Sequence, residues 1–547
     1  MPFELTFPYA IDERYSKRVA YFCMEYGIDQ PLKTYAGGLG FLAGSHLRSA
    51  WQLKQAFVAI GVLWKYGYYD QIRKQDQTMD VFFMEKVYGF LQDTGIRFTI
   101  TVSDHPVKVA AYYLPPTVFQ TAPLFLLSTD LPENDYLAQT ICHHLYDANP
   151  ETRAAAGILL GEGGAKLLEI LQWQPDTYHL NESHGLPLAF YLYNQLRSAE
   201  LLKKKLVFTN HTPEPGGNER IQTSLLYKLG YCNGLSADLV RSVSHTENGV
   251  MDLTLTALKL AGRANGVSAR HGRYLQSIRT ADSCATIAIT NAQDFSYWHH
   301  PAMYQALQNH DDGALLSEKA RGKKQLFEVV ADQCGEIYNE HVLTIVFAKR
   351  FTGYKRPELL LNDMQRLHRL LTNADHPVQL IWAGKPYPMD YSAIATFDKL
   401  VHLTKSYPNC CVLTGYEMKL SRLLKQGADV WLNVPRLGHE ASGTSGMSAA
   451  MNGALNVSIP DGWFPEFAQD GINSFVINPT DPSLPEHLQD ENDAHELFEI
   501  LEKRVIPLYY NDQGAWLSMI RHSMEDIRPA FDSLRMADEY YTRLYSD

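Results

Sequence analysis

Cysteine and long apolar runs are scarce in this sequence. Cysteine occurs 7 times in 547 residues, without metal-site spacing, and Cys410 and Cys411 are simply adjacent. A small scattered set of this kind is typical of free thiols in a reducing compartment. Met1 to Ser16 contain no recognisable secretory leader, and no stretch reaches the ~20 uninterrupted apolar residues of a membrane helix. We therefore expect a cytoplasmic protein with no membrane partner and no bound metal.

Excess positive charge is also absent. The chain has 49 Lys and Arg against 61 Asp and Glu, a formal net charge of −12, and the cations are spread along the sequence. This distribution argues against nucleic acid as a partner, but it leaves room for a local basic pocket that binds phosphate. The length exceeds what one hydrophobic core supports, so two domains are expected.

Short apolar runs alternate with amphipathic segments in the C-terminal half. The pattern predicts buried strands at 343–348, 379–383, 410–414 and 429–433, separated by helices at 357–372, 391–406 and 419–426. This alternation predicts an α/β domain with a parallel, doubly wound sheet.

The N-terminal half repeats the alternation less regularly. It suggests strands at 18–23 and 205–209, shorter strands at 177–180 and 242–244, and helices at 152–171 and 187–204. We expect two Rossmann-like domains facing a cleft, with ligands at the carboxyl ends of the strands. The expected division is an N-terminal acceptor-side domain over 1–300, a C-terminal phosphate-side domain over 301–514, and a helical segment over 515–547 that crosses back to the first domain.

A glycine-rich turn, YAGGLG at 35–40, follows the first predicted strand and precedes a helical run at 42–55. Glycines allow backbone N–H groups to approach an anion at a helix start. An ordinary turn explains this motif equally well.

A basic motif, KRFTGYKR at 349–356, directly follows the predicted strand at 343–348. Four cations at a strand-to-helix turn suit the neutralisation of phosphate, since Arg offers a planar fork and Lys a compact charge. Lys385 follows the next strand in the same way. A solvated basic loop is the alternative interpretation.

The run HEASGTSGM at 439–447 leads into a helical segment at 448–455. The Glu440 carboxylate could accept hydrogen bonds from sugar hydroxyls, and the amides of 442–445 could bind phosphate or sugar oxygens. Helix capping by Ser442 or Thr444 needs one such residue and leaves the rest of the run unexplained.

Two polar clusters follow apolar runs in the N-terminal half: NESH at 181–184 and FTNHTPE at 208–214. Histidine, asparagine and carboxylates at strand ends suit hydroxyl recognition or proton handling. A single such histidine is more often structural, but two clusters at equivalent places favour a site.

Taken together, these motifs resemble the glycogen and α-glucan phosphorylases. The resemblance runs through 19–50, 179–184, 208–213, 289–291, 347–356 and 416–452, and the EASGTSGM run is its most specific part. It implies a GT-B fold and hexosyl transfer that retains the α-anomeric configuration.

The resemblance also implies residue roles. As catalytic residues it gives Arg350 and Lys355 at the phosphates, His211 with its main-chain carbonyl near the anomeric carbon, and Glu440 at the sugar hydroxyls. The substrate-binding residues that we predict are Gly37, Gly38, Leu39, Asn181, Glu182, His184, Thr212, Asn291, Lys349, Lys385, Tyr416, Ala441, Ser442, Gly443, Thr444 and Ser448.

One departure from the family pattern concerns the cofactor. In the family, a lysine at the position of Ser448 forms the Schiff base to pyridoxal phosphate. Serine has no amine and cannot form an imine, so we expect no covalent cofactor and consider pyridoxal phosphate unlikely.

Three functions remain open. The favoured one is a retaining glycosyltransferase that takes a glucosyl unit from a nucleotide-diphosphate sugar, whose two phosphates replace the substrate and cofactor phosphates, and gives it to a carbohydrate or small acceptor. The second is an α-glucan phosphorylase that releases glucose 1-phosphate with non-covalent or no pyridoxal phosphate. The third is an inactive carbohydrate-binding or regulatory homologue. A homodimer is compatible with each of them.

Overall fold

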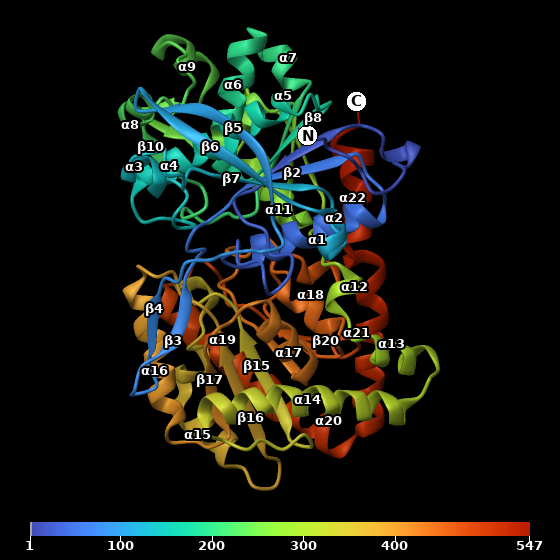
Figure 1. The fold of residues 1–547 in the computed structure, drawn as a ribbon. Coiled ribbons are helices and arrows are strands. Elements are labelled where there is room, and N and C mark those ends of the chain that lie inside the picture. Colours follow the sequence, from blue (N-terminus) through green and yellow to red (C-terminus); the bar gives the residue numbers. More distant parts are fainter. Residues whose placement is uncertain (1–2, 547) are drawn as a thin grey trace. The chain divides into compact units, whose positions relative to one another are not determined.

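The computed structural model describes residues 3–546, which form two compact units (Figure 1). Unit 1 runs from the first described residue to Tyr69, continues over Phe83–Asp294, and resumes at Ser533. Unit 2 comprises Asp70–Phe82 and Phe295–Asp532. The expected boundaries at 300 and 514 therefore differ from the observed division, which also assigns a hairpin from the N-terminal half to unit 2.

Unit 1 is built on a nine-stranded sheet within residues 3–546, and its first strand lies in the middle. Strand β1 pairs in parallel with both β2 and β8, with Val19 opposite Phe57 and Thr177. In spatial order the strands are β14 (Ala285–Ala288), β13 (Arg263–Gly266), β9 (Leu206–Thr209), β8 (Thr177–Asn181), β1 (Val19–Phe22), β2 (Phe57–Val62), β7 (Leu124–Ser128), β6 (His105–Leu114) and β5 (Gln92–Val102). Because the chain winds outward in both directions from β1, the sheet has a switch point between β1 and β8.

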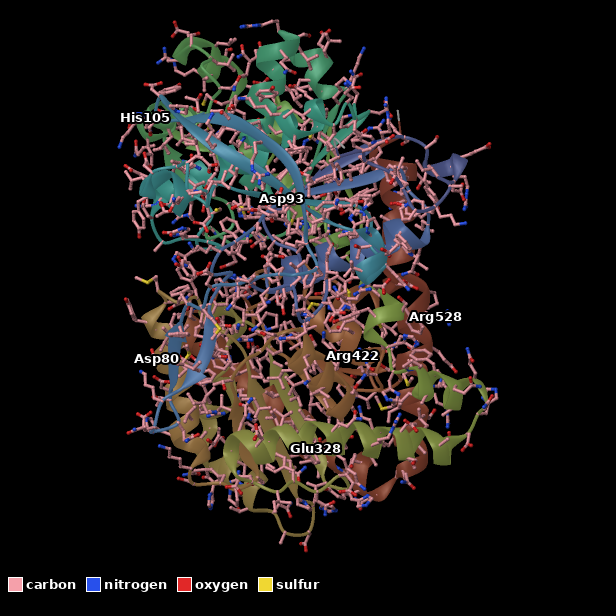
Figure 2. The ribbon with its side chains drawn as sticks, in the orientation of Figure 1. Asp80, Asp93, His105, Glu328, Arg422 and Arg528 are labelled. Carbon is pink, nitrogen blue, oxygen red and sulfur yellow. The ribbon has the colours of Figure 1, made fainter. Side chains whose placement is uncertain are left out.

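The edge of this sheet is an antiparallel hairpin that the sequence did not predict. Asp93 lies towards its open end and His105 at its turn (Figure 2). A three-stranded sheet completes the unit, with strands β10 (Arg220–Gln222), β12 (Val250–Asp252) and β11 (Thr246–Glu247).

The helices of unit 1 correct one sequence prediction. The strand expected at 242–244 is wrong, since Val243 ends a helix whose N-cap is Ser236 and whose buried Val240 and Val243 have helical spacing. The helices and helical turns are η1 (Glu13–Tyr15), α1 (Gly38–Gln52), α2 (Pro116–Phe119), α3 (Tyr136–Thr140), α4 (Pro150–Ile158), η2 (Leu159–Gly163), α5 (Gly164–Ile170), η3 (Ser183–Gly185), α6 (Pro187–Leu196), α7 (Ala199–Lys203), α8 (Thr223–Leu229), α9 (Ala237–Val243), α10 (Leu253–Leu260), α11 (Ala269–Ile278), α22 (Ser533–Glu539) and η8 (Tyr540–Leu544).

Unit 2 is built on a six-stranded, all-parallel sheet within the described part of the chain. In spatial order its strands are β17 (Cys410–Leu413), β16 (Val378–Ala383), β15 (Leu343–Ala348), β18 (Val430–Asn433), β19 (Leu455–Ser458) and β20 (Ser474–Val476). This is the strand order of dinucleotide-binding domains, and its switch point lies between β15 and β18. The predicted α/β fold with two Rossmann-like, doubly wound domains, as in the GT-B class, is thereby confirmed.

The four predicted strands of this sheet, β15 to β18, are buried along their length, which explains why apolar runs predicted them. A hairpin of β3 (Asp70–Arg73) and β4 (Met79–Phe82) belongs to unit 2 because Gln71 donates to the Gly384 carbonyl at 3.0 Å and accepts from the Gly415 amide at 3.0 Å. The helices and helical turns are α12 (Phe295–Trp298), α13 (Pro301–Gln308), α14 (Asp312–Cys334), η4 (Gly353–Lys355), η5 (Leu359–Asp363), α15 (Met364–Thr372), α16 (Tyr391–Thr404), α17 (Met418–Gly427), α18 (Ser445–Ala450), η6 (Phe464–Glu466), α19 (Glu486–Ile500), η7 (Leu501–Val505), α20 (Ile506–Asn511) and α21 (Gln513–Phe531). In residues 3–546, no helix has the length and apolar character needed to span a membrane.

The C-terminal residues complete the core of unit 1. Helix α22 packs on α1, as Figure 1 shows, and Met536 and Tyr540 join the apolar cluster around β1. The Tyr545 hydroxyl bonds Nδ1 of His179 at 2.7 Å, and Thr209 Oγ1 bonds Nε2 of the same ring at 2.7 Å. His179, which lies in the central sheet, therefore has both ring nitrogens satisfied in a fully buried place.

We predict that Tyr545→Phe lowers the melting temperature of the protein. The substitution keeps the ring but leaves His179 Nδ1 buried without a partner, which costs about 1–3 kcal/mol. Differential scanning calorimetry measures the effect, with Tyr391→Phe as the control because Tyr391 is 70% exposed. Equal melting temperatures for the two variants would show that the His179 contact does not stabilise unit 1.

Candidate active site

The basic motif of unit 2 begins where β15 ends. Lys349 is buried, and its ammonium donates to the Ser445 hydroxyl of α18 at 3.1 Å. The backbone of Gly384 comes so close that a Cβ there would lie 1.9 Å from the Lys349 carbonyl oxygen, so only glycine fits. Burial and the charge of Lys355 lower the pKa of Lys349 to about 7. The amine is therefore poised to gain a proton when an anion binds next to it.

Lys355 and Glu440 form a buried ion pair in the same unit, with side chains 11% and 8% exposed. Burial disfavours both charges, but the attraction between the two groups prevails. The pKa of Lys355 is raised by Glu440, and the pKa of Glu440 is lowered by Lys355 and Lys349. Both side chains are therefore charged at neutral pH.

Asp461 holds the loop that carries Glu440, and the sequence analysis missed it. Its Oδ2 accepts from the amides of Gly438 at 2.7 Å and Glu440 at 3.0 Å, and its Oδ1 accepts from Gly462 at 2.9 Å. Gly462 has φ +58°, a conformation that favours glycine. The Asp461-Gly462 pair shortly after β19 is the sequence signal that could have revealed this role.

The remaining cations of the basic motif divide by environment. Arg350 is exposed, but its charge still acts on Lys355 and Glu440. Arg356 is structural, since its buried guanidinium donates to the Val434 carbonyl at 2.9 Å and pairs with Asp493 at 2.8 Å. Of the four cations, Lys349 and Lys355 therefore lie inside the site. Arg350 lies at the surface, and Arg356 stabilises the fold.

Two further predicted contacts of unit 2 are engaged within the protein. Lys385 donates to Glu417 at 2.9 Å, and both side chains are largely buried. The Tyr416 hydroxyl donates to the Ala348 carbonyl at 3.2 Å, and burial raises its pKa to about 12. These residues support the ends of β15 and β17 and lie beside the Lys349 loop.

The EASG segment leaves one hydroxyl unused. The Oγ of Ser442 is buried and has no hydrogen-bond partner within residues 3–546. Gly443 lies against Glu440, since a Cβ there would come 3.4 Å from the Glu440 carboxyl carbon. Ala441 and Thr444 are buried beside them. The segment therefore combines a charged carboxylate with a spare hydroxyl, which suits the recognition of a sugar.

Ser448 is bonded within its own helix. It is fully buried, and its hydroxyl donates to the carbonyls of Thr444 at 3.2 Å and Ser445 at 3.3 Å within its own helix. A serine in a helix readily bonds the carbonyl four residues before it, and the substrate contact expected at Ser448 stays a prediction.

A buried lysine that the sequence analysis missed lies close to this helix. The Lys425 ammonium of α17 is 3.5 Å from the centre of the Trp298 ring. Asn452 links the backbones of Trp298 and Ser448, since its side-chain amide donates to the Trp298 carbonyl at 2.8 Å and the Ser448 carbonyl at 2.7 Å. Burial and then Lys349 lower the pKa of Lys425 well below its usual range. A lysine next to the buried Leu424 on an amphipathic helix was the available signal.

In unit 1, Glu25 shapes the glycine turn, and the sequence analysis also missed this residue. Glu25 is buried, and its Oε2 accepts from the amides of Ala36 at 2.7 Å and Gly37 at 3.1 Å. Tyr146 donates to Oε1 at 2.7 Å. The turn bears Gly37, Gly38 and Leu39, and within residues 3–546 no atom outside the adjacent residues and the local helix backbone lies within 4 Å of where Cβ atoms at the two glycines would stand. The backbone there is open to a ligand.

His211 contacts three other predicted residues of unit 1 through its side chain and backbone: Asn181, Glu182 and Asn291. His211 Nε2 bonds Asn181 Oδ1 at 2.6 Å, and its backbone amide donates to Glu182 at 2.6 Å. Asn291 lies 3.5 Å from His211 Nδ1. Because Asn181 offers an acceptor to Nε2, we assign the proton to that nitrogen. Burial lowers the pKa of His211 to about 3, so the ring is neutral.

Glu182 is strained and buried at this point. Its φ of +72° is unusual for a residue other than glycine. Burial raises its pKa to about 8, although the amide of His211 favours the charged form. Such strain at a strand end is typical of a functional position.

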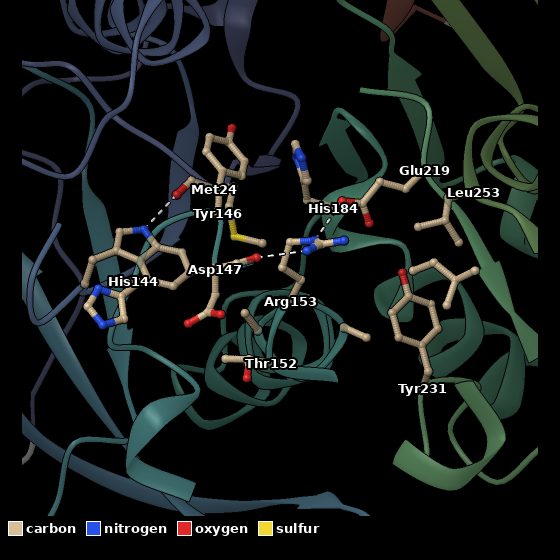
Figure 3. Close-up of a pocket in the computed structure, with 15 residues that line it drawn as sticks. Met24, His144, Tyr146, Asp147, Thr152, Arg153, His184, Glu219, Tyr231 and Leu253 are labelled. Carbon is tan, nitrogen blue, oxygen red and sulfur yellow. Dashed lines mark hydrogen bonds and ion pairs between the residues drawn. The ribbon is translucent and has the colours of Figure 1, made fainter. Parts of the chain in front are cut away.

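The other unit 1 predictions have different surroundings. The Thr212 hydroxyl accepts from the Glu214 amide at 2.9 Å within its own loop. His184 lines a pocket that also contains Tyr146, Arg153 and Glu219 (Figure 3). The sequence reasoning named His184 but none of the other three. In the part of the chain that the structure describes, no cluster of three or more His, Cys, Asp or Glu side chains is arranged to hold a metal.

Comparisons with known proteins agree with these features. A family model described as carbohydrate phosphorylase matches residues 246–475. The chain is 42% identical to an uncharacterized protein of Methanocaldococcus jannaschii, over 97% of this chain and 100% of that protein. It is 31% identical to a maltodextrin phosphorylase of Thermococcus litoralis, over 97% of this chain and 71% of the relative. A glycogen phosphorylase of Aquifex aeolicus is 28% identical over 98% of this chain and 87% of the relative.

Together with these comparisons, the two doubly wound sheets identify the chain as a hexosyltransferase of the GT-B class. Within this class, the chain belongs to the α-glucan phosphorylase family.

Removal of one partner of the Lys355–Glu440 pair should destabilise unit 2. We expect Lys355→Met to cost about 3–5 kcal/mol, because it leaves the Glu440 charge buried and uncompensated. Chemical denaturation followed by tryptophan fluorescence measures this loss. The double variant Lys355→Met/Glu440→Leu should recover most of it, whereas Lys399→Met, at an exposed position, should have no effect. A single variant as stable as the wild type would contradict the buried pair.

Glu182 should make the stability of unit 1 depend on pH. Its folded-state pKa of about 8 lies above the value of an unfolded glutamate. The folded state therefore binds more protons between these values, and this contribution to stability falls as the pH rises from about 4.5 to 8. Glu182→Gln should flatten the melting temperature over this range relative to the wild type. Parallel profiles for the two proteins would show that Glu182 is charged in the folded state.

Proposed function

We propose that the protein is a retaining glucosyltransferase that uses a nucleotide-diphosphate sugar as donor and works without pyridoxal phosphate. One observation supports this proposal: the cations expected to bind phosphate are present, while the lysine that forms the Schiff base in the family is replaced by serine. Lys355 pairs with Glu440 in unit 2, and the charge of Lys349 also acts on Glu440. The family's Schiff-base position holds Ser448, whose hydroxyl is bonded within its helix.

The electrostatics of unit 2 support a diphosphate ligand. Lys349 has a pKa of about 7 and is only partly protonated at neutral pH. A phosphate beside it would favour the charged amine, and a second phosphate could interact with Arg350 and Lys355. These cations would stabilise the leaving diphosphate as the bond to the sugar breaks.

The hydroxyl-binding roles follow from the neighbouring polar groups. Glu440, held in place by Asp461, is charged and accepts hydrogen bonds, and Ser442 has a spare hydroxyl. In unit 1, neutral His211 and Asn291 present polar groups suited to sugar hydroxyls. Proton handling by His211 is not part of the proposal, because the ring stays neutral.

The residues present do not fit a cofactor tethered at position 448. An imine requires an amine, and Ser448 has none. Two buried amines lie near this helix on other elements: Lys319 of α14 donates to the Asn452 carbonyl at 3.0 Å, and Lys425 of α17 lies over Trp298. We therefore propose that the enzyme carries no covalent pyridoxal phosphate.

Phosphorolysis of an α-glucan is the second candidate function. The chain's similarity to a maltodextrin phosphorylase and a glycogen phosphorylase favours this function. Inorganic phosphate would then occupy the cation site, and glucose 1-phosphate would be the product.

Thermal shift distinguishes the two donors. We expect UDP-glucose or ADP-glucose to raise the melting temperature more than glucose 1-phosphate does, because a diphosphate engages more cations. Arg350→Ala should reduce this stabilisation and lower turnover at least tenfold, whereas Arg369→Ala, on the exposed side of α15, should change neither. Stabilisation by glucose 1-phosphate alone would favour phosphorolysis, and no response to any donor would favour an inactive homologue.

Borohydride reduction tests the absence of the cofactor. The purified protein should show no absorbance in the pyridoxal region, and peptide mass spectrometry after reduction should find no pyridoxyl adduct. An adduct at Lys425 or at any other lysine would overturn the proposal of a cofactor-free enzyme.

A further inference from the structure

Two cysteines lie together in unit 2, and the proposed sugar transfer uses neither of them. Cys334 is the last residue of α14, and Cys411 lies in β17. Val330 and Cys334 are one helical turn apart and pack on the same apolar cluster, to which Cys411 and Leu413 contribute from alternate positions of the strand. The two thiols therefore meet where the helix ends against the strand, and they share a hydrogen bond.

The β3–β4 hairpin adds a cation to this contact. The Arg73 guanidinium lies 3.6 Å from the Cys334 sulfur and also donates to the Val412 carbonyl of β17. The Cys334 thiol is 3.9 Å from the same carbonyl oxygen. Gln333 fixes the end of the helix, since its side-chain oxygen accepts from the Thr414 amide at 2.9 Å. Cys334 is thus held against the strand and beside a positive charge.

Cys334 differs from the other cysteines in exposure and in charge. It is partly exposed, whereas the other six, all of them within residues 3–546, are buried. The hydrogen bond with Cys411 and the charge of Arg73 lower the pKa of Cys334, against the effect of its burial. Burial raises the pKa of Cys411 well above its usual range. Access to solvent, a lowered pKa and a nearby cation are the features of reactive thiols.

We propose that Cys334 and Cys411 form a redox-active pair, in which a hydroperoxide oxidises Cys334 and Cys411 then closes a reversible disulfide. The Cys334 thiolate attacks a peroxide oxygen and the O–O bond breaks. The sulfur becomes a sulfenic acid, and the rest of the peroxide takes up a proton and leaves as water or an alcohol. The Cys411 sulfur then attacks the Cys334 sulfur. An S–S bond forms, the S–OH bond breaks, and the Cys411 proton leaves with the hydroxide as water.

The pair is placed to act on the ends of β16 and β17. The hairpin that carries Arg73 also carries Gln71, which bonds the Gly384 carbonyl and the Gly415 amide at 3.0 Å each. Oxidation removes the thiolate that attracts Arg73. The hairpin should therefore be held less firmly in the oxidised protein, and the backbone next to Lys385 should lose part of its support. This inference does not depend on the identity of the sugar donor.

Peptide mass spectrometry of the full-length protein tests the disulfide. The protein is treated with stoichiometric hydrogen peroxide, blocked with N-ethylmaleimide and digested with trypsin. We expect the peptide that contains Cys334 to be linked to the peptide that contains Cys410 and Cys411, with loss of the two thiol hydrogens, and dithiothreitol to reverse the link. Fragmentation between the adjacent cysteines should place the link at Cys411. This measurement needs no substitution, and a link at Cys410, or no link, would overturn the proposal.

Two variants at adjacent positions separate the roles of the cysteines. In Cys411→Ala, the sulfenic acid at Cys334 should persist, and dimedone should label it. Cys410→Ala is the matched control, because Cys410 is as buried as its neighbour but alternates with it along β17. This variant should still form the linked pair. Dimedone labelling at another cysteine, or a disulfide at Cys334 that persists in Cys411→Ala, would contradict the assignment.

Limited proteolysis measures the effect on the hairpin. Trypsin should cleave after Lys74, which lies next to the exposed turn of the hairpin, faster in oxidised than in reduced protein, and dithiothreitol should restore the slower rate. Cys334→Ser cannot form the bond and should be cleaved at the same rate with and without peroxide. Equal rates for oxidised and reduced wild-type protein would overturn the action of the pair on the hairpin.

Discussion

The buried ion pair between Lys355 and Glu440 is the interaction on which the chemistry of unit 2 depends. Each charge would be too costly in the interior alone, and each is kept ionised by the other. Asp461 fixes the loop of Glu440 through backbone amides, so the carboxylate cannot move away to water. Lys349 lies beside the pair with a lowered pKa, and an anion would complete this set of charges.

The two units differ in the charge of the groups that they gather at the ends of their strands. Unit 2 gathers lysines at the carboxyl end of β15, where a phosphate would be stabilised. Unit 1 gathers neutral histidines, amides and acidic side chains at the carboxyl ends of β1, β2 and β8.

Most of the fold of unit 2 could be predicted because its strands are buried on both faces and therefore read as short apolar runs, such as 343–348. The sheet edge in unit 1 could not, because β5 alternates between buried and exposed positions and pairs with β6 through a local hairpin. Within the site, Lys349, Lys355 and Glu440 were predicted from their motifs. Glu25, Asp461 and Lys425 were missed because they act on residues distant in the sequence.

The sequence alone determined the class of fold, the family, the basic motif and the absence of an amine at Ser448, because each depends on local pattern or on residue identity. Only the tertiary structure decided which cations share the site with Glu440, that Arg356 is structural, and that the Ser448 hydroxyl is bonded within its helix. It also revealed the acidic, aromatic pocket of unit 1, whose residues come from strands and helices far apart in the chain. Burial and pairing set these charges, and both depend on contacts between distant segments that no local pattern encodes.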